Sequence, residues 1–183
     1  MPVREKTYEQ VAREDPAGRW ELHAGELRRK PDMTQEHNDA TSILAFELQR
    51  QLPLSHFRVR SNAGRARWQA AHSYVPDVMV IPVSMMHARS NTPGELEVYS
   101  EALPFVAEVW SRSTGEYDVD EKLPQYIARG DMEVWRVHPY ERTVTAWRRG
   151  SDGRYARTVH GPAGVIAIPS LPGVTIDIAT LWL

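Results

Sequence analysis

Apolar residues recur with a helical period in one long segment of the chain. Between Thr34 and Leu52 they are spaced three or four residues apart, which predicts an amphipathic helix. Thr34 is a typical N-cap residue, and Pro53 is expected to end the helix. A shorter helix is expected around Tyr8 and Val11, and another from Pro124 to Arg129, where Gly130 supplies the C-terminal stop.

Other segments have the pattern of β-strands. WELHAGELRRK alternates on both sides of Ala24 and Gly25, which predicts a β-hairpin near the N-terminus. Apolar runs rich in β-branched residues predict strands in FRVRS, YVPDVMVIP, LPFVAEVWS, EVWRVHP and RTVTAWRR, and the tail GVIAIPSLPGVTIDIATLWL adds one or two more. This order of elements predicts a mixed α/β (α+β) domain whose central sheet is flanked by helices.

Composition narrows the class of protein. Of the 183 residues 42% are hydrophobic and 25% are charged, which is ordinary for a globular protein, and we expect a single domain spanning residues 1–183. The sequence contains no cysteine, which excludes disulfides, thiolate zinc sites and a cysteine nucleophile. No stretch approaches the roughly 18 apolar residues of a membrane span, and the first residues lack an apolar signal segment. We therefore expect a cytoplasmic protein with no membrane partner.

The net charge of −2 argues against a basic surface over the whole protein. A local basic face is still open, because the segment FRVRSNAGRARW carries four arginines and no acid: Arg58, Arg60, Arg65 and Arg67. These side chains are either phosphate contacts, which position a duplex without reading its sequence, or an ordinary solvated strand and turn.

Two acids interrupt segments that otherwise look buried. Asp77 precedes an apolar run of four residues, and Glu108 lies inside FVAEVW. A carboxylate in such a strand has a large desolvation cost unless a cation, a proton or several donors compensate it. Mg²⁺ binds oxygen ligands and commonly uses one or two carboxylates, so Asp77, Glu108 and the backbone carbonyl of Val109 are candidate ligands. Lys122 is the candidate for orienting the attacking water and stabilising charge on a phosphoryl group.

The same segments resemble a known family. P-D, E-V followed by a Ser/Thr-rich turn, and D-x-x-E-K occur here in YVPDVMVIP, FVAEVWSRST and YDVDEKLPQYIARG. Their order and spacing resemble the Uma2-like family, also called domain of unknown function 820, within the PD-(D/E)XK superfamily of restriction-endonuclease-like nucleases. The resemblance runs from about Trp20 to the C-terminus and includes the hairpin WELHAGEL.

The resemblance implies a restriction-endonuclease-like fold with an N-terminal β-hairpin. It also implies a divalent-metal-dependent endonuclease that acts on DNA, with Asp77 and Glu108 as ligands of Mg²⁺ or Mn²⁺. In the wider superfamily the catalytic lysine stands two residues after the glutamate, where this chain has Trp110. Lys122 matches the lysine that replaces it in Uma2-like proteins. Two further departures are Arg112 in place of a proline, and Pro124 within a stretch that is usually continuous helix, so we expect the helix to start near Lys122.

Four other polar residues are candidates for a secondary role. By the family likeness, His37 and Glu26 fall at recurrent polar positions. Glu47 follows Ile43 by four residues and approaches the core face of the long helix, and Tyr126 follows Lys122 by four residues. Each also has an ordinary structural interpretation: His37 as a core histidine, Glu26 and Glu47 as surface acids, and Tyr126 as a packing residue.

Two other functions are compatible with the sequence. A catalytically degenerate nuclease fold could bind nucleic acid or protein without cutting, which would suit the mild acidity and the presence of Trp110 and Pro124. A glycosidase could use the two carboxylates as its acid–base pair, but that chemistry gives Lys122 no role. A two-fold homodimer would suit an enzyme that cuts both strands.

Overall fold

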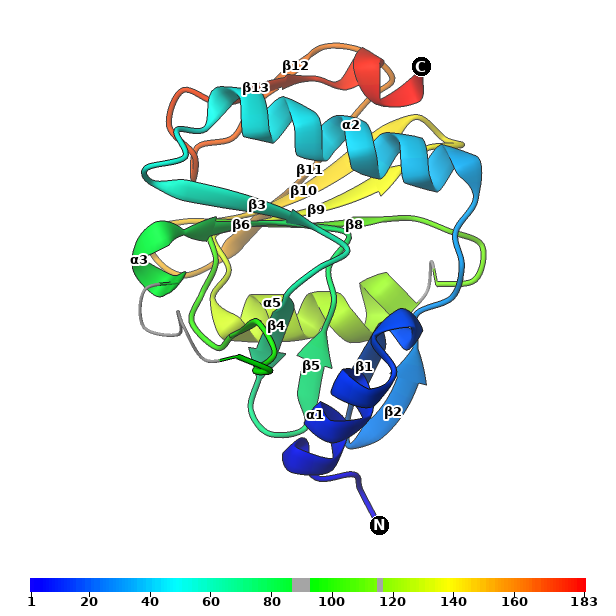
Figure 1. The fold of residues 1–183 in the computed structure, drawn as a ribbon. Coiled ribbons are helices and arrows are strands. Elements are labelled where there is room, and N and C mark those ends of the chain that lie inside the picture. The colour runs from blue at the N-terminus through cyan, green and yellow to red at the C-terminus, as the bar shows by residue number, and fades with distance from the viewer. Residues whose placement is uncertain (87–92, 115–116) are drawn as a thin grey trace.

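A six-stranded sheet lies at the centre of the structure, a computed structural model that describes residues 1–86, 93–114 and 117–183 (Figure 1). Its order is β11 (Tyr155–His160), β10 (Thr143–Arg149), β9 (Glu133–His138), β8 (Phe105–Val109), β6 (Val78–Pro82) and β3 (Phe57–Ser61). Strands β8 and β9 pair in parallel, and the other neighbours in this sheet pair antiparallel.

Helix α2 (Gln35–Gln51) covers one face of this sheet (Figure 1). The Thr34 hydroxyl accepts a hydrogen bond from the backbone N–H of His37, which is the predicted N-cap. The buried positions include Ala40, Leu44 and Leu48, and they pack on the sheet as the period of four predicts. The predicted long helix is confirmed. Beyond it lie β12 (Val165–Ala167), β13 (Thr175–Asp177) and the terminal turn η4 (Ile178–Trp182).

A crossover covers the other face. Because β8 and β9 are parallel, the chain between them must pass over the sheet, and it does so as a π-helical turn, η3 (Asp118–Lys122), followed by α5 (Leu123–Arg129). Gly130 ends α5 with a positive φ of 82°, as predicted. Glycine suits this position because it has no Cβ to clash in the left-handed region.

A second sheet packs below α5 in Figure 1. Its order is β2 (Glu26–Arg29), β1 (Trp20–His23), β5 (His72–Tyr74), β4 (Arg65–Trp68) and β7 (Val98–Tyr99). The predicted hairpin is its β1–β2 pair, and its turn residues Ala24 and Gly25 both have positive φ, as in a type I′ turn. Helix α1 (Glu5–Glu14) packs on this sheet, while η1 (Pro16–Gly18) and α3 (Val83–Met86) are short connections.

The predicted fold class is confirmed: a central sheet lies between helices, and the N-terminal hairpin is present. The sequence analysis did not predict four of the strands, namely β4, β5, β7 and β11. Strand β11 is mostly exposed and β7 has two residues, so neither carries a clear alternation of apolar and polar side chains. None of the described helices has the length and apolar character that crossing a membrane requires.

Candidate active site

Asp77 and Glu108 lie on the same face of the central sheet. Val78 pairs with Ala107 in the antiparallel β6–β8 register, so the next position places Asp77 opposite Glu108. Residues directly opposite in such a pair project to the same side of the sheet. Both carboxyl groups are buried, and this face is the one covered by the η3–α5 crossover.

Three donors surround the Asp77 carboxylate. Lys30 Nζ donates to Oδ1 at 2.7 Å and also to the carbonyl of Val75 at 2.8 Å. On Oδ2, His37 Nε2 lies at 3.1 Å and the backbone N–H of Val109 donates at 2.7 Å. Burial alone would raise the pKa of Asp77, but the charge of Lys30 and the hydrogen bond from His37 outweigh it and hold that pKa far below its usual range. Asp77 is therefore a fully compensated anion.

Glu108 is compensated much less well. Its Oε1 accepts from Tyr126 Oη at 2.5 Å and from Lys122 Nζ at 3.3 Å, while its buried Oε2 has no hydrogen-bond partner among the described residues. Burial raises the pKa of Glu108 to about 8; the charge of Lys122 opposes this shift and the carboxylate of Asp118 adds to it. Because one of its oxygens is unpaired in the described part of the chain, the buried Glu108 carboxyl group needs a proton or a cation to compensate its charge.

Lys122 is held between three carboxyl groups. Its Nζ lies 3.1 Å from Glu21, 3.2 Å from Asp118 and 3.3 Å from Glu108, and the side chain is buried. The π-helical turn places it there, because the backbone N–H of Leu123 bonds to the carbonyl of Asp118 and closes a wide turn just before α5. Burial alone would lower the pKa of Lys122, but these carboxylates raise it well above its ordinary value.

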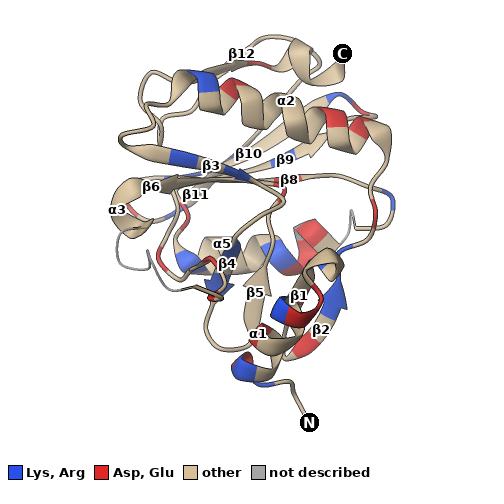
Figure 2. Cartoon of the chain, viewed as in Figure 1, with Lys and Arg blue, Asp and Glu red and all other residues tan. Residues whose placement is uncertain are grey.

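Six ionisable groups thus form one buried network, called here the acid–lysine cluster: Glu21, Lys30, Asp77, Glu108, Asp118 and Lys122. Its two ends interact, since the charges of Lys30 and Asp77 both act on Glu108. Four carboxyl groups face two ammonium groups, so two negative charges are left over when every group is ionised. Burial also raises the pKa of Asp118, which shows the same shortage of positive charge. In Figure 2 acidic and basic positions lie side by side where the crossover approaches the hairpin.

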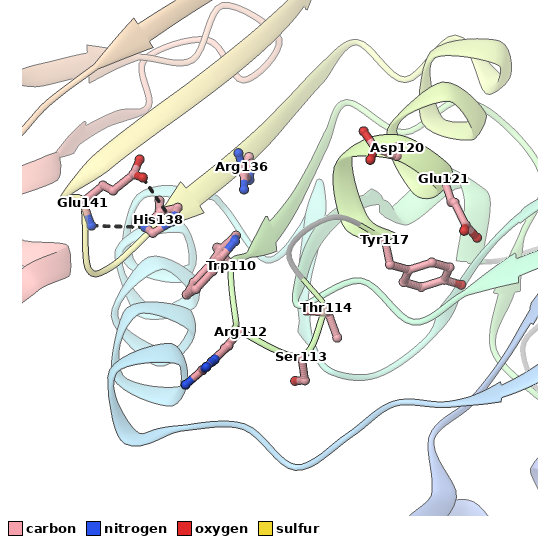
Figure 3. Close-up of a pocket in the computed structure, with 10 residues that line it drawn as sticks. All are labelled: Trp110, Arg112, Ser113, Thr114, Tyr117, Asp120, Glu121, Arg136, His138 and Glu141. Atoms are coloured by element: carbon pink, nitrogen blue, oxygen red, sulfur yellow. Dashed lines mark hydrogen bonds and ion pairs between the residues drawn. The ribbon is translucent and has the colours of Figure 1, made fainter.

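The cluster is reached from a cavity of about 280 Å³ that Glu21, Lys30 and Lys122 line. A larger cavity of about 860 Å³ lies beside it, and the two share Ser113 and Tyr117 (Figure 3). Three members of the cluster, Glu21, Lys30 and Lys122, therefore border a cavity, as expected of a site that acts on a ligand from solvent.

The donor set suits a hard divalent cation. Carboxylate oxygens are the ligands that Mg²⁺ prefers, Glu108 offers an unused oxygen, and the two surplus negative charges equal one divalent charge. In the arrangement of residues 1–86, 93–114 and 117–183, no three His, Asp or Glu side chains could hold a metal ion together. The Lys122 ammonium lies among the carboxylates instead, so metal binding requires this lysine to shift.

Some of the predicted site residues lie together in the structure and others do not. Asp77, Glu108, Lys122, His37 and Tyr126 come together in and around the cluster. Glu26 lies on the hairpin with its side chain 75% exposed, and Glu47 is half-buried and pairs with Arg50, away from the cluster. Among the described residues no contact assigns the Val109 carbonyl to the site, although the Val109 N–H donates to Asp77.

The four candidate arginines for nucleic-acid contact are occupied by neighbours within the fold. Arg60 binds Glu97, Arg65 donates to the Tyr8 hydroxyl, and Arg67 pairs with Glu5 and Glu9. Arg58 donates to the backbone carbonyls of Leu54 and Phe57. Acidic and basic positions are interspersed over the ribbon in Figure 2. Phosphate contact by these arginines stays a prediction.

Sequence reasoning missed three members of the cluster: Glu21, Lys30 and Asp118. One signal could have found Lys30, because the chain has only three lysines, Lys6, Lys30 and Lys122, against nineteen arginines. A lysine retained in so arginine-rich a sequence suggests a role in which a compact ammonium is needed. Glu21 gave no comparable signal, since alternation in a hairpin does not tell which face is covered.

The hydrogen bond between Tyr126 and Glu108 leads to a stability prediction. Tyr126→Phe should lower the free energy of unfolding by about 1–3 kcal/mol, because it removes a buried donor from a carboxyl group that already lacks partners. Urea unfolding at pH 7 measures this loss. Tyr140→Phe is the matched control, since that hydroxyl bonds to Thr34 and Glu36 at the exposed surface and its loss should cost less than about 0.5 kcal/mol. Equal losses for the two variants would contradict the prediction.

Comparisons with known proteins bear on this geometry. The model of the family Uma2, described as "Putative restriction endonuclease", matches residues 6–179. A solved structure from Anabaena variabilis, described as a "putative nuclease belonging to DUF820", aligns with a TM-score of 0.80 and 20% sequence identity over 99% of this chain and 98% of that chain. At this identity the structural likeness establishes a shared fold. No curated protein matches the chain.

Proposed function

The chain belongs to the Uma2 family, and from that premise we propose that it is a divalent-metal-dependent endonuclease that hydrolyses phosphodiester bonds of DNA. One observation carries the proposal: a buried cluster has four carboxyl groups but only two lysines, and one oxygen of Glu108 is unpaired among the described residues. Stable burial of such a group requires a compensating cation or proton. The position of Lys30 and Lys122 at the wall of a cavity suits a site that receives a phosphate group.

Each residue then has a distinct role. Glu108 and Asp77 hold Mg²⁺ or Mn²⁺, which when bound activates water and offsets charge on the phosphoryl oxygens. Lys122 orients the attacking water and stabilises the same developing charge once it has moved from between the carboxylates. Lys30 and His37 fix the orientation of Asp77 and keep it ionised.

Nicking of supercoiled plasmid DNA in the presence of Mg²⁺ or Mn²⁺ tests the proposal. Asp77→Asn and Glu108→Gln keep the side-chain shape and remove one charge each, so each should lower the rate by at least about 100-fold, which corresponds to ~2.7 kcal/mol of lost transition-state stabilisation. Glu47→Gln is the control, because Glu47 pairs with Arg50 away from the cluster and its loss should leave the rate unchanged. Cutting at the parent rate by both cluster variants would disprove the assignment.

One observation favours the second candidate, a degenerate nuclease fold that binds nucleic acid or protein without cutting. The Lys122 ammonium already lies among three carboxyl groups, where it supplies part of the positive charge that a metal ion would supply. Calorimetric titration with Mn²⁺ separates the two: binding that disappears in Glu108→Gln supports the enzyme, and no binding to the parent supports the degenerate fold. The glycosidase alternative is disfavoured, because it gives no role to Lys122, which contacts Glu108 directly.

A further inference from the structure

We propose that the cavity of about 860 Å³ beside the acid–lysine cluster binds one unpaired nucleotide of the substrate strand, with its base against Trp110 and His138 and its phosphate at Arg136. This inference rests on the proposed nuclease function and adds a substrate class to it: nucleic acid that is single-stranded or locally unpaired next to the bond that is cut.

A rigid aromatic surface forms one side of the cavity (Figure 3). The rings of Trp110 and His138 are stacked, with centroids 4.3 Å apart and planes inclined by 19°. The backbone N–H of Trp110 donates to the carbonyl of Val137 and so anchors its main chain, and the backbone N–H of Glu141 donates to His138 Nδ1 and so holds that ring. Trp110 is partly exposed and lines the cavity. A preset aromatic surface of this kind accepts any base, because every base has a flat face.

Arg136 lies between this surface and the cluster and makes no ion pair with any described residue. It is the register partner of Glu108 in the parallel β8–β9 pair, so the two side chains project to the same face. Its Nε is buried and has no hydrogen-bond partner within the described parts of the chain. Arg136 lines the large cavity and also a gap of about 10 Å³ next to Glu108 and Asp118. A planar guanidinium with a free N–H matches the geometry of a phosphate group.

The acidic side chains around the cavity do not pair with Arg136, so its charge can bind a phosphate group. Glu121 is engaged by Arg28 at 2.8 Å and by His23 at 3.0 Å. The other two acids of the lining are Glu141, whose side chain is 69% exposed, and Asp120, which is also exposed, so solvent screens both charges. Arg112 adds a second, exposed positive charge to the same cavity. The volume lies within the range of roughly 300–1,000 Å³ found for small-ligand sites, so one nucleotide can enter.

The connection between the two cavities explains why the nucleotide should be unpaired. Ser113, Thr114 and Tyr117 line both, so a strand with one phosphate at the cluster can place its neighbouring nucleotide in the large cavity. A base inside a duplex is stacked on its neighbours and can reach an aromatic wall only after it leaves the stack, at a cost of a few kcal/mol. A single strand does not have this cost.

Binding without cleavage tests the inference. Fluorescence anisotropy of a short labelled oligodeoxynucleotide, single-stranded or annealed, is measured in EDTA so that no metal-dependent cutting occurs. Trp110→Ala should weaken single-strand binding by roughly 5- to 100-fold, whereas Trp110→Phe, which keeps a ring, should retain most of it. Arg136→Gln should weaken binding about tenfold and reduce the slope of log K against log salt by about 0.7, the value of one lost phosphate contact on a single strand.

The controls separate this inference from the proposed function. Arg154→Gln, on a side chain that is 89% exposed and does not line the cavity, should bind as the parent does. Parent-like binding by Trp110→Ala and Arg136→Gln, or tighter binding of duplex than of single strand by the parent, would overturn the subsite even if the protein cuts plasmid DNA. Trp110- and Arg136-dependent binding by a parent that does not cut would support the subsite and reject the nuclease.

Discussion

Lys122→Met is expected to lower the free energy of unfolding by about 3–5 kcal/mol and to abolish nuclease activity. The substitution keeps most of the volume of the side chain and removes only the ammonium, which lies within 3.3 Å of Glu21, Glu108 and Asp118. Removing one partner from a buried ionic group leaves uncompensated charge, and that is the costly case for buried ion pairs. In the acid–lysine cluster the surplus negative charge with every group ionised would rise from two to three.

Urea unfolding of Lys122→Met and of the double variant Lys122→Met/Glu108→Gln measures this effect. The double variant should recover part of the lost stability, because it removes one carboxylate together with its cation. Lys6→Met is a suitable control, since Lys6 is exposed and should change the free energy of unfolding by less than about 0.5 kcal/mol. A Lys122→Met protein as stable as the parent would mean that the cluster is not charged as described. The loss should also shrink toward low pH, where the carboxyl groups take up protons.

The second large effect is a metal-dependent change in the pH profile of stability. The pKa of Glu108 is raised to about 8 by burial, from an ordinary value near 4.5 in the unfolded chain. Between these two values the folded state holds more protons than the unfolded state, so stability falls as pH rises through this window. Each pKa unit corresponds to ~1.4 kcal/mol, so the fall should reach several kcal/mol in EDTA. Asp118, whose pKa is also raised by burial, acts in the same direction.

Asp77 does not cancel this trend, because its pKa is lowered and its contribution is lost only in acid, below the window. Glu108→Gln should therefore be less sensitive to pH between 4.5 and 8, and above pH 8 it should be more stable than the parent. Mn²⁺ competes with protons for the same oxygens, so it should stabilise the parent more at pH 8 than at pH 6. At a concentration one hundred times its Kd the total stabilisation is ~2.7 kcal/mol.

Thermal unfolding of the parent and of Glu108→Gln, each in EDTA and in Mn²⁺ over this pH range, measures these quantities. Glu47→Gln supplies the control, because Glu47 lies outside the cluster. Stability of the parent that rises from pH 5 to pH 8 in EDTA would show that Glu108 is ionised throughout. Equal stabilisation by Mn²⁺ in the parent and in Glu108→Gln would place the metal elsewhere.

The sequence was most informative where a residue type conflicts with its surroundings. Asp77 and Glu108 stand out because acids in apolar strands need compensation, and the antiparallel register then sets them side by side. The long helix and the hairpin were predictable because their signals are local: a period of four in α2, and two positive-φ positions in the β1–β2 turn. Local patterns need no knowledge of which elements later pack together.

The remaining members of the cluster depend on packing between distant segments. Glu21 pairs with Arg28 and Glu26 pairs with His23, so both acids project to the same face of the hairpin, and alternation alone does not say which of them the crossover will cover. The sequence analysis chose Glu26, but the covered acid is Glu21. Lys30 reaches Asp77 only because the hairpin packs beside β6, a contact between residues 47 positions apart.

The wide turn before α5 makes the position of the Lys122 ammonium depend on the length of the β8–β9 connection. An α-helix advances about 100° per residue. Deleting one residue between Asp118 and Lys122 would therefore rotate the Lys122 side chain by roughly a quarter turn around the helix axis, although Lys122 itself is kept. Pro124 also limits where α5 can begin, because a helix accepts proline only in its first turn. Natural or designed relatives should therefore conserve the count of residues in this connection more strictly than the identity of those on its outer surface.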